Sequence, residues 1–259
     1  MYSIERKAEI ISMLELNSSV DVNKMAAYFK NSKETIRRDL RELEAEGVVK
    51  RTHGGAVLAE NVKNLKEYPL MVRGIQQFDE KNAICEKAAG LILNGDTIFV
   101  DNSSTCLNLL KYIDNTIHVT IVTNSLQLLM ESAKLNNPNL LFICLGGVFN
   151  NSNFSIYGNI ALENAKAFYP NKVFVSCAGL SKEKKITDNS VYEAETKRFM
   201  VEQSKETVLL ADHTKFTNNG SVYFIGINQV STIVTDNKTK IEEKSFIHKY
   251  HVEILVADV

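Results

Sequence analysis

The chain has 259 residues, of which 44% are hydrophobic and 24% are charged, and its formal net charge is −1. This length exceeds that of one small helical module, so a second domain of ordinary size is expected. The near-zero charge excludes a uniformly basic protein, and any affinity for nucleic acid has to come from a local patch.

The cysteines and the apolar runs bear on the compartment in which the protein works. Four cysteines are far apart in sequence and show no paired spacing: Cys85, Cys106, Cys144 and Cys177. This spacing favours free thiols in a reducing compartment over disulfides or a metal site. The longest apolar run, near residues 140–149, is interrupted by two glycines and is too short to span a bilayer. We therefore expect a cytoplasmic protein with no membrane segment and no metal.

The first sixty residues predict three helices. Apolar residues recur at helical spacing over residues 3–16 and 22–29. A tight turn follows at Asn31, and Ser32 is placed to cap a third helix over residues 33–46. That helix carries Ile36, Leu40 and Leu43 on one narrow stripe. Three helices, of which the last two are joined by a short turn, are typical of a helix-turn-helix unit.

The outer face of the third predicted helix is rich in arginine. Glu34, Arg37, Arg38 and Arg41 lie opposite the apolar stripe. Guanidinium groups in this position suit phosphates and guanine edges in the major groove. The alternative is a solvated face whose arginines are balanced by the glutamates at positions 42, 44 and 46.

A short β-hairpin is predicted directly after the third helix. Gly47 can end the helix in a left-handed conformation. Two strands, over residues 48–51 and 56–58, then flank a turn in which Gly54 and Gly55 are expected to supply positive φ. This hairpin would be a wing lying along the DNA backbone or a minor groove, although His53 could equally be a turn residue without a contact.

The winged helix-turn-helix therefore predicts double-stranded DNA as a partner. Phosphate contacts are expected from Lys33, Arg37 and Arg51, and base reading from Glu34, Thr35 and Arg38. The full set of predicted DNA-binding residues is Ser32, Lys33, Glu34, Thr35, Arg37, Arg38, Arg41, Lys50, Arg51 and His53.

A connecting arm and a second domain follow the wing. Residues 59–78 lose clear periodicity and contain Pro69 and Gly74, so we predict domains over residues 1–58 and 79–259 with a linker between them. Beyond the linker, short apolar runs alternate with amphipathic stretches. Strands are predicted at 97–100, 119–122, 140–145, 173–177, 208–211, 233–235 and 253–256. Helices are predicted at 79–93, 105–113, 126–135, 160–168, 192–204 and 242–250. This alternation predicts an α/β domain, an open and mostly parallel sheet with helices on both faces.

Polar residues gather directly after the predicted strands, over residues 101–105, 123–125, 146–147, 178–179 and 212–216. Ligands of open parallel sheets bind outside the carboxyl ends of the strands, so these turns are expected to face one crevice. Ser103, Ser104 and Thr105 could hold a phosphate through hydroxyl and N–H groups, and Lys215 could add a point charge. Simple helix capping by one serine is the alternative.

Acidic and basic residues after the fourth predicted strand are candidates for sugar hydroxyls. These are Asp188, Glu193 and Lys197. The alternative is a surface helix on which Glu193 and Lys197 pair at i, i+4.

Several motifs together resemble one known family. They are TIRRDL, LE and HGGA within residues 35–56, GDTIFVD at 95–101, TNSL at 123–126, LGG at 145–147 and LLADHTKF at 209–216. Their order over essentially the whole chain is similar to that of the DeoR-type family of bacterial sugar-metabolism regulators.

The resemblance implies a winged-helix domain joined to an effector domain similar to ribose-5-phosphate isomerase. It places the phosphate loop on residues 101–105, from Asp101 to Thr105. The implied sugar-facing residues are Asn124, Gly147, Asp188, Glu193, Lys197 and Lys215. Many members have glycine and threonine where this chain has Ser103 and Ser104, and these two side chains would crowd the anion more than glycine does.

The expected function is repression of an operon for carbohydrate uptake or breakdown, controlled by a phosphorylated sugar. A homodimer or homotetramer on operator DNA is expected, with the sugar phosphate as effector and no cofactor. One alternative is an activator of the same class. Another is a phosphosugar isomerase with a DNA-binding appendage, although no pair of titratable residues stands out at a spacing typical of acid–base catalysis.

Overall fold

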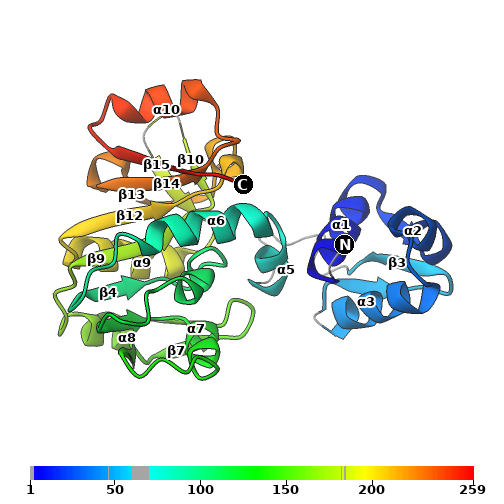
Figure 1. Ribbon diagram of the computed structural model, residues 1–259, viewed down its shortest axis with the longest axis horizontal. Helices are drawn as coiled ribbons and strands as arrows, with labels where there is room; N and C mark the ends of the chain where they lie inside the picture. The colour runs from blue at the N-terminus through cyan, green and yellow to red at the C-terminus, as the bar shows by residue number, and fades with distance from the viewer. Residues whose placement is uncertain (1–2, 46, 60–69, 182, 184) are drawn as a thin grey trace. The chain divides into compact units, whose positions relative to one another are not determined.

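The structure is a computed structural model that describes residues 3–45, 47–59, 70–181, 183 and 185–259 (Figure 1). The chain divides into two compact units, Met1–Phe78 and Asp79–Val259. Residue 46, at the predicted end of the third helix, and residues 60–69 of the predicted linker lie outside the described part.

The first unit is a winged helix-turn-helix. Its helices are α1 (Ser3–Asn17), α2 (Val22–Phe29) and α3 (Lys33–Ala45), which confirms the three predicted helices. Strands β2 (Val49–Arg51) and β3 (Gly55–Leu58) form the predicted hairpin. A third strand, β1 (Ser19–Asp21), pairs with β3 at the sheet edge, in the order β1-β3-β2. Its three residues, one exposed and two partly buried, are too few to show a strand pattern, so β1 is recognised only through its pairing with β3.

The turns around α3 follow from local chemistry. Ser32 caps α3 as predicted, because its Oγ accepts a hydrogen bond from Thr35 N at 3.1 Å. Gly47 has φ +73°, and Val48 N donates to Leu43 O at 2.9 Å, so the helix ends in the predicted left-handed conformation.

The two wing glycines differ from prediction. Neither Gly54 nor Gly55 adopts positive φ, so that expectation is wrong. Gly55 is required for a different reason, since a Cβ at this position would lie 1.7 Å from Val20 O on β1. The glycine therefore allows two strands to approach each other closely.

The core of the first unit contains the predicted apolar stripe. Ile36, Leu40 and Leu43 of α3 are buried against residues of α1 and α2. A short helix, α5 (Leu70–Ile75), lies within the residues predicted as a connecting arm, and its Val72 joins the same cluster. One buried side chain therefore gives part of this arm a packing role.

The second unit is built on a seven-stranded parallel sheet in the order β15-β14-β12-β9-β4-β5-β6. Its strands are β4 (Thr97–Val100), β5 (Val119–Thr123), β6 (Leu140–Cys144), β9 (Lys172–Ser176), β12 (Glu206–Leu210), β14 (Thr232–Asp236) and β15 (Glu253–Ala257). The seven predicted strands are thereby confirmed. The order reverses between β4 and β9, which are neighbours in the sheet although β5 and β6 separate them in the chain. This reversal is the topological switch point, where open sheets of this type bind ligands.

Alternate residues of each central strand enter two cores, because successive side chains of a strand point to opposite faces. Phe99, Val175 and Leu209 pack with α8 (Asn159–Ala165) and α9 (Val191–Gln203). Ile98 and Phe174 pack on the other face with α6 (Phe78–Ala89), α7 (Leu126–Ser132) and the 3₁₀ helix η1 (Cys106–Lys111). The prediction of helices on both faces is confirmed. Helix α10 (Ile241–His248) precedes the last strand.

Short antiparallel strands were not predicted. A hairpin joins β7 (Val148–Asn150) and β8 (Ser155–Tyr157). A three-stranded sheet contains β10 (Gly179–Leu180), β11 (Lys185–Asp188) and β13 (Val222–Gly226). The 3₁₀ helices η2 (His213–Phe216) and η3 (Ile227–Gln229) flank β13 in the chain. Segments of two to five residues carry too few alternations for a period of two to stand out.

Two smaller expectations concern thiols and membranes. Cys85, Cys106 and Cys177 are buried free thiols as predicted, whereas Cys144, on edge strand β6, is exposed. Within the described ranges, no helix combines the length and the apolar character needed to cross a bilayer.

Candidate functional site

The outer face of α3 presents its arginines to solvent. The side chains of Arg37, Arg38 and Arg41 are 57%, 62% and 50% exposed. Arg37 and Arg41 pair with Glu34, and Arg38 pairs with Glu42 at 3.8 Å. Both predicted interpretations therefore describe part of this face, which is accessible and also charge-balanced. Exposed ion pairs contribute little to stability, so DNA phosphates can compete for these guanidinium groups.

The wing is tied to α3 by one glutamate. Glu44 Oε2 accepts from Arg51 Nε at 2.6 Å, and Glu44 Oε1 accepts from Arg51 N at 3.0 Å. The hydrogen bond from the backbone N–H of Arg51 lowers the pKa of Glu44 most, and the bond from the Arg51 guanidinium lowers it further. The wing residues Lys50, Arg51 and His53 are exposed, so they remain accessible to a duplex.

A buried ion pair fixes α3 against α1. Asp39, on the inner side of α3, accepts from Arg6 Nε at 2.5 Å and from Arg6 Nη2 at 3.0 Å. Ser3 Oγ donates to the same carboxylate at 3.1 Å. The hydrogen bond to Asp39 raises the pKa of Arg6. This fork-shaped contact sets the position from which α3 presents its outer face.

In the second unit, Asp101 joins the two strands at the switch point. It follows β4, and its Oδ2 accepts from Ser176 N, at the end of β9, at 3.0 Å. Its Oδ1 accepts from Ser103 N at 2.9 Å and from Ser103 Oγ at 2.5 Å. Asp101 is fully buried. The carboxylate thus organises the turn in which a phosphate site is predicted.

Lys197 holds this arrangement from α9. Its Nζ lies 2.6 Å from Asp188 Oδ2 and 3.2 Å from Asp101 Oδ2, and it donates to Ser176 O at 3.0 Å. Burial by itself lowers the pKa of Lys197, but the attraction of Asp188 and Asp101 outweighs it and raises that pKa well above the usual value. Burial raises the pKa of Asp188, and the ammonium more than compensates, so the net shift is downward. Three predicted site residues therefore form one buried ionic cluster.

Glu193 is also buried and has other partners. Its Oε1 accepts from Asn153 Nδ2 at 2.8 Å and from Ser155 Oγ at 2.9 Å. The alternative of a surface helix with a Glu193–Lys197 pair is therefore wrong, because both side chains are buried and their hydrogen bonds go elsewhere. Glu193 anchors the β7–β8 hairpin to α9.

The remaining predicted residues lie at other strand ends. Asn124 follows β5 and contacts Asn102, since its Nδ2 lies 3.3 Å from Asn102 Oδ1. Lys215 lies in η2 with its Nζ 3.9 Å from Asp212 Oδ2. Gly147 has φ +127°, and a Cβ there would lie 2.7 Å from Tyr157 O, so its backbone packs closely against β8.

Three residues near these groups were missed as individual candidates. Lys81 of α6 is buried and donates to Ser104 Oγ at 3.1 Å. Asn102 and Asp212 each carry a buried side-chain atom without a hydrogen-bond partner in the described part of the chain. The position of Asn102 and Asp212 directly after strands was the available signal. Lys81 gave none, because only folding brings α6 over the Ser104 turn.

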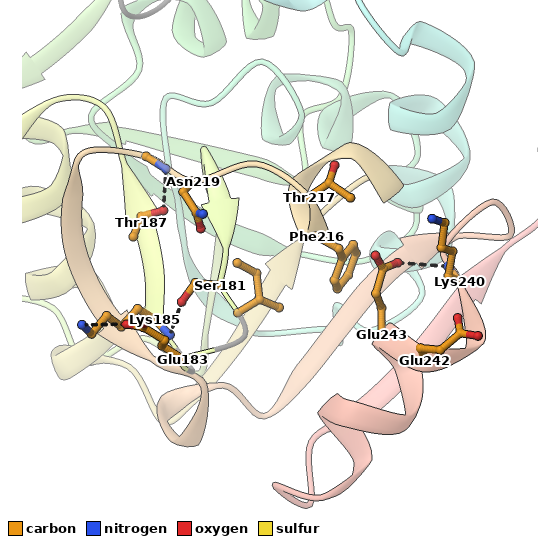
Figure 2. A pocket seen from close by; sticks show the side chains of 12 residues that line it. Ser181, Glu183, Lys185, Thr187, Phe216, Thr217, Asn219, Lys240, Glu242 and Glu243 are labelled. Carbon is orange, nitrogen blue, oxygen red and sulfur yellow. Dashed lines mark hydrogen bonds and ion pairs between the residues drawn. The ribbon is translucent and has the colours of Figure 1, made fainter.

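A cavity of about 1000 Å³ lies beside these loops (Figure 2). Its walls come from β10 and β11, from the chain around η2 and from the start of α10. Thr187 and Phe216 line it and are sequence neighbours of Asp188 and Lys215. The predicted phosphate residues 101–105 are buried and do not line this cavity.

Comparison with protein families matches both units. A family described as the DeoR-like helix-turn-helix domain matches residues 6–62. A family described as the DeoR C terminal sensor domain matches residues 76–237, which is more than half of the chain.

Two full-length relatives agree with the family matches. The HTH-type transcriptional regulator GolR of Listeria innocua is 32% identical over 92% of this chain and 92% of its own length. The glycerol-3-phosphate regulon repressor of Escherichia coli is 27% identical over 98% of this chain and 99% of its own. Ribose 5-phosphate isomerase A from Methanocaldococcus jannaschii, a solved structure, gives a TM-score of 0.41 at 13% identity over 54% of this chain and 55% of its own. The full-length relatives are named regulators rather than enzymes, so the isomerase alternative is not supported. This chain belongs to the DeoR family of DNA-binding transcriptional regulators.

Proposed function

We propose that the chain represses an operon for carbohydrate uptake or catabolism and that a phosphorylated sugar bound in the second unit controls this repression. One observation carries the proposal, namely that two different binding surfaces occur in one chain. The first unit has an exposed arginine face on α3, and the second has a dense polar cluster at the switch point of its sheet. Relatives named as repressors, including the glycerol-3-phosphate regulon repressor, support repression over activation.

The DNA contacts follow from the exposure of α3 and the wing. Lys33, Arg37 and Arg51 contact phosphates, and Arg41, Lys50 and His53 extend this contact along the backbone. Glu34, Thr35 and Arg38 face base edges, with Ser32 at the start of the helix. Since the arginines already have glutamate partners, DNA binding exchanges weak surface pairs for phosphate contacts and should weaken strongly with salt.

The effector site separates into supporting and contacting groups. Asp101, Asp188, Glu193 and Lys197 bond mainly to protein groups and hold the loops in place. The charge for a phosphate comes from Lys81, beside Ser104, and from Lys215 of η2. Ser103, Thr105 and Gly147 shape the turns around the sugar phosphate.

Control requires that the two ligands favour different arrangements of a self-assembled homodimer or homotetramer. The effector then reduces DNA affinity by the same factor by which operator DNA reduces effector affinity. A two-fold dimer reads half-sites about one helical turn (~10 bp), or a multiple of it, apart.

Gel-shift titration on the gene's own upstream DNA tests the proposal. A shift at low salt that glucose 6-phosphate, ribose 5-phosphate or glycerol 3-phosphate reverses is the expected result, with the unphosphorylated compounds as controls. Absence of any shift, with or without these compounds, would contradict DNA binding at that site. A shift that appears only after a sugar phosphate is added would favour the activator alternative.

A further inference from the structure

Two neighbouring strands of the parallel sheet end in asparagines whose side chains meet. Asn102 follows β4 and Asn124 follows β5, and these strands pair in register from Thr97 with Thr120 to Val100 with Thr123. Both side chains are 1% exposed. Asn124 Nδ2 donates to Asn102 Oδ1 and to Ile156 O, each at 3.3 Å.

This amide pair makes one of its two possible mutual hydrogen bonds. Asn102 Nδ2 and Asn124 Oδ1, the atoms that would complete the pair, are both buried and have no hydrogen-bond partner among the described residues. A buried amide group without a partner opposes folding, so native structures rarely keep one without a reason. One of these atoms is a donor and the other an acceptor, and their side chains already contact each other, so they are suited to a third group that bonds both.

The chemistry of the third group follows from the two atoms. It has to accept from the N–H of Asn102 and donate to the carbonyl of Asn124. A hydroxyl does both, whereas a phosphate or carboxylate oxygen only accepts and an ammonium only donates. The geometry therefore favours a neutral hydroxyl over either kind of charged group.

We propose that the Asn102–Asn124 pair is a hydroxyl-recognition subsite of the effector site and that Asn102 selects a hydroxylated carbon over a deoxygenated one. This inference rests on the proposed function and adds the chemistry of one effector contact. It assigns an individual role to Asn102, which the family resemblance includes only as part of the phosphate loop over residues 101–105. A site built to bond a hydroxyl rejects the analogue that lacks it, because its own polar groups then stay unpaired.

The surroundings of the pair fit an effector site. Asn102 lies between Asp101 and Ser103, at the edge where the strand order reverses. A further buried atom without a hydrogen bond, Asp212 Oδ2, lies at the same edge after β12, with the Lys215 ammonium 3.9 Å away. Since adjacent strands are about 4.8 Å apart, two strand spacings place it roughly 10 Å from the end of β4. That carboxylate oxygen would accept from a second hydroxyl.

Entry of a ligand involves the β8 segment. Ile156 N donates to Asn124 O at 2.7 Å, and Ile156 O accepts from Asn124 Nδ2. Neither unpartnered amide atom reaches the surface, so binding requires this segment to shift.

The first test needs no ligand. Asn102→Leu preserves the branching of the side chain and removes the unpaired donor. If the pair exists for an effector, the melting temperature of the ligand-free variant should stay within about 2 °C of the parent or rise above it. The matched control is Asn171→Leu, which deletes the acceptor of Thr97 N near the opposite ends of the strands and should lower the melting temperature. A loss in Asn102→Leu as large as that in Asn171→Leu would show a structural, water-bridged pair and overturn the proposal.

The second test uses ribose 5-phosphate, glucose 6-phosphate and their monodeoxy derivatives in thermal-shift titrations. Whichever of the two sugar phosphates binds the parent more tightly should bind more tightly than one of its own monodeoxy derivatives. The expected ratio of the two apparent Kd values is roughly tenfold to hundredfold. Asn102→Leu should bring this ratio close to one, while Asn171→Leu should retain it. An unchanged ratio in Asn102→Leu overturns the subsite alone. Failure of every sugar phosphate to shift the parent melt instead overturns the proposed effector class, and the subsite with it.

Discussion

Positive charge serves opposite purposes in the two units. The arginines of α3 are at least half exposed and pair with glutamates on the same helix. Lys197 of α9 is 4% exposed and lies between two buried carboxylates. An exposed pair can be exchanged for another anion because water screens both states. A buried pair cannot, because each charge would be left without compensation. The comparison separates groups that bind a partner from groups that hold the binding groups in place.

The largest expected effect comes from breaking the buried cluster. Lys197→Met should destabilise the second unit by about 3–5 kcal/mol, because Asp101 and Asp188 would stay buried without a counter-charge. Urea unfolding near neutral pH measures the change. Lys87→Met, at an exposed position of α6, is the control and should change stability by less than about 0.5 kcal/mol.

Lys197→Met should also reverse part of the pH dependence of the free energy of unfolding. In the parent, the folded-state pKa of Asp188 is lowered, so this carboxylate contributes stability above its unfolded pKa of about 3.9 and loses it as the pH falls through the folded value. Without Lys197, burial raises the pKa of Asp188, so the variant should gain stability relative to the parent as the pH falls from about 7 to about 5. Equal pH dependence of parent and variant would contradict the assigned role of Lys197.

A smaller effect is expected from the buried pair of the first unit. Asp39→Asn weakens the charged contacts to Arg6, which should reduce the stability of that unit by about 1.5–3 kcal/mol. Hydrogen exchange of α1 and α3 should accelerate by roughly tenfold to hundredfold. Exchange in the second unit is the internal control, and an equal acceleration there would contradict a local role of the Asp39–Arg6 pair in the first unit.

An exposed arginine should affect DNA binding and leave stability unchanged. Arg37→Ala should weaken binding across DNA sequences and reduce the slope of log affinity against log salt by about one, with a change in stability of less than about 0.5 kcal/mol. Gel shifts at several salt concentrations measure the slope. Lys166→Ala removes a comparable surface pair with Glu163 on α8 and should leave DNA binding unchanged. An unaltered slope in Arg37→Ala would remove this residue from the DNA interface.

The smallest effect is expected at the wing. Glu44→Gln removes a carboxylate that binds Arg51 and that would repel DNA phosphates. Affinity for DNA at low salt should rise about two- to fivefold, because Arg51 becomes available and the repulsion disappears. Fluorescence anisotropy with labelled operator DNA detects this range. A decrease in affinity would instead show that Glu44 positions the wing for binding.

Local patterns were sufficient for much of the fold. The stripe of Ile36, Leu40 and Leu43 predicted the inner face of α3, and Ser32 and Gly47 predicted its ends. Apolar runs predicted the strands of the parallel sheet, because a strand buried on both faces needs no polar alternation. The short antiparallel strands remained hidden, since β1 and β10 are defined by the strands with which they pair.

The candidate site was predicted only in outline. Polar turns after strands predicted that Asp101 and Asn124 lie at one edge of the sheet, because carboxyl ends of parallel strands share one edge. The sequence did not predict which of these residues hold the loops in place and which face a ligand. Whether Lys197 faces a ligand or a carboxylate depends on how α9 packs against the end of β4, and Lys197 and Asp101 are far apart in sequence.

The sequence by itself determined the family, the two kinds of domain and the arginine-bearing helix, because helical periodicity, caps and strand-end motifs are written within a few consecutive residues. Only the tertiary structure decided that Lys81 meets Ser104, that Lys197 joins Asp101 to Asp188, and that Asn102 and Asn124 leave a donor and an acceptor unpaired. Each of these contacts joins residues brought together by strand pairing and helix packing, and their chemistry depends on burial, which no local pattern specifies.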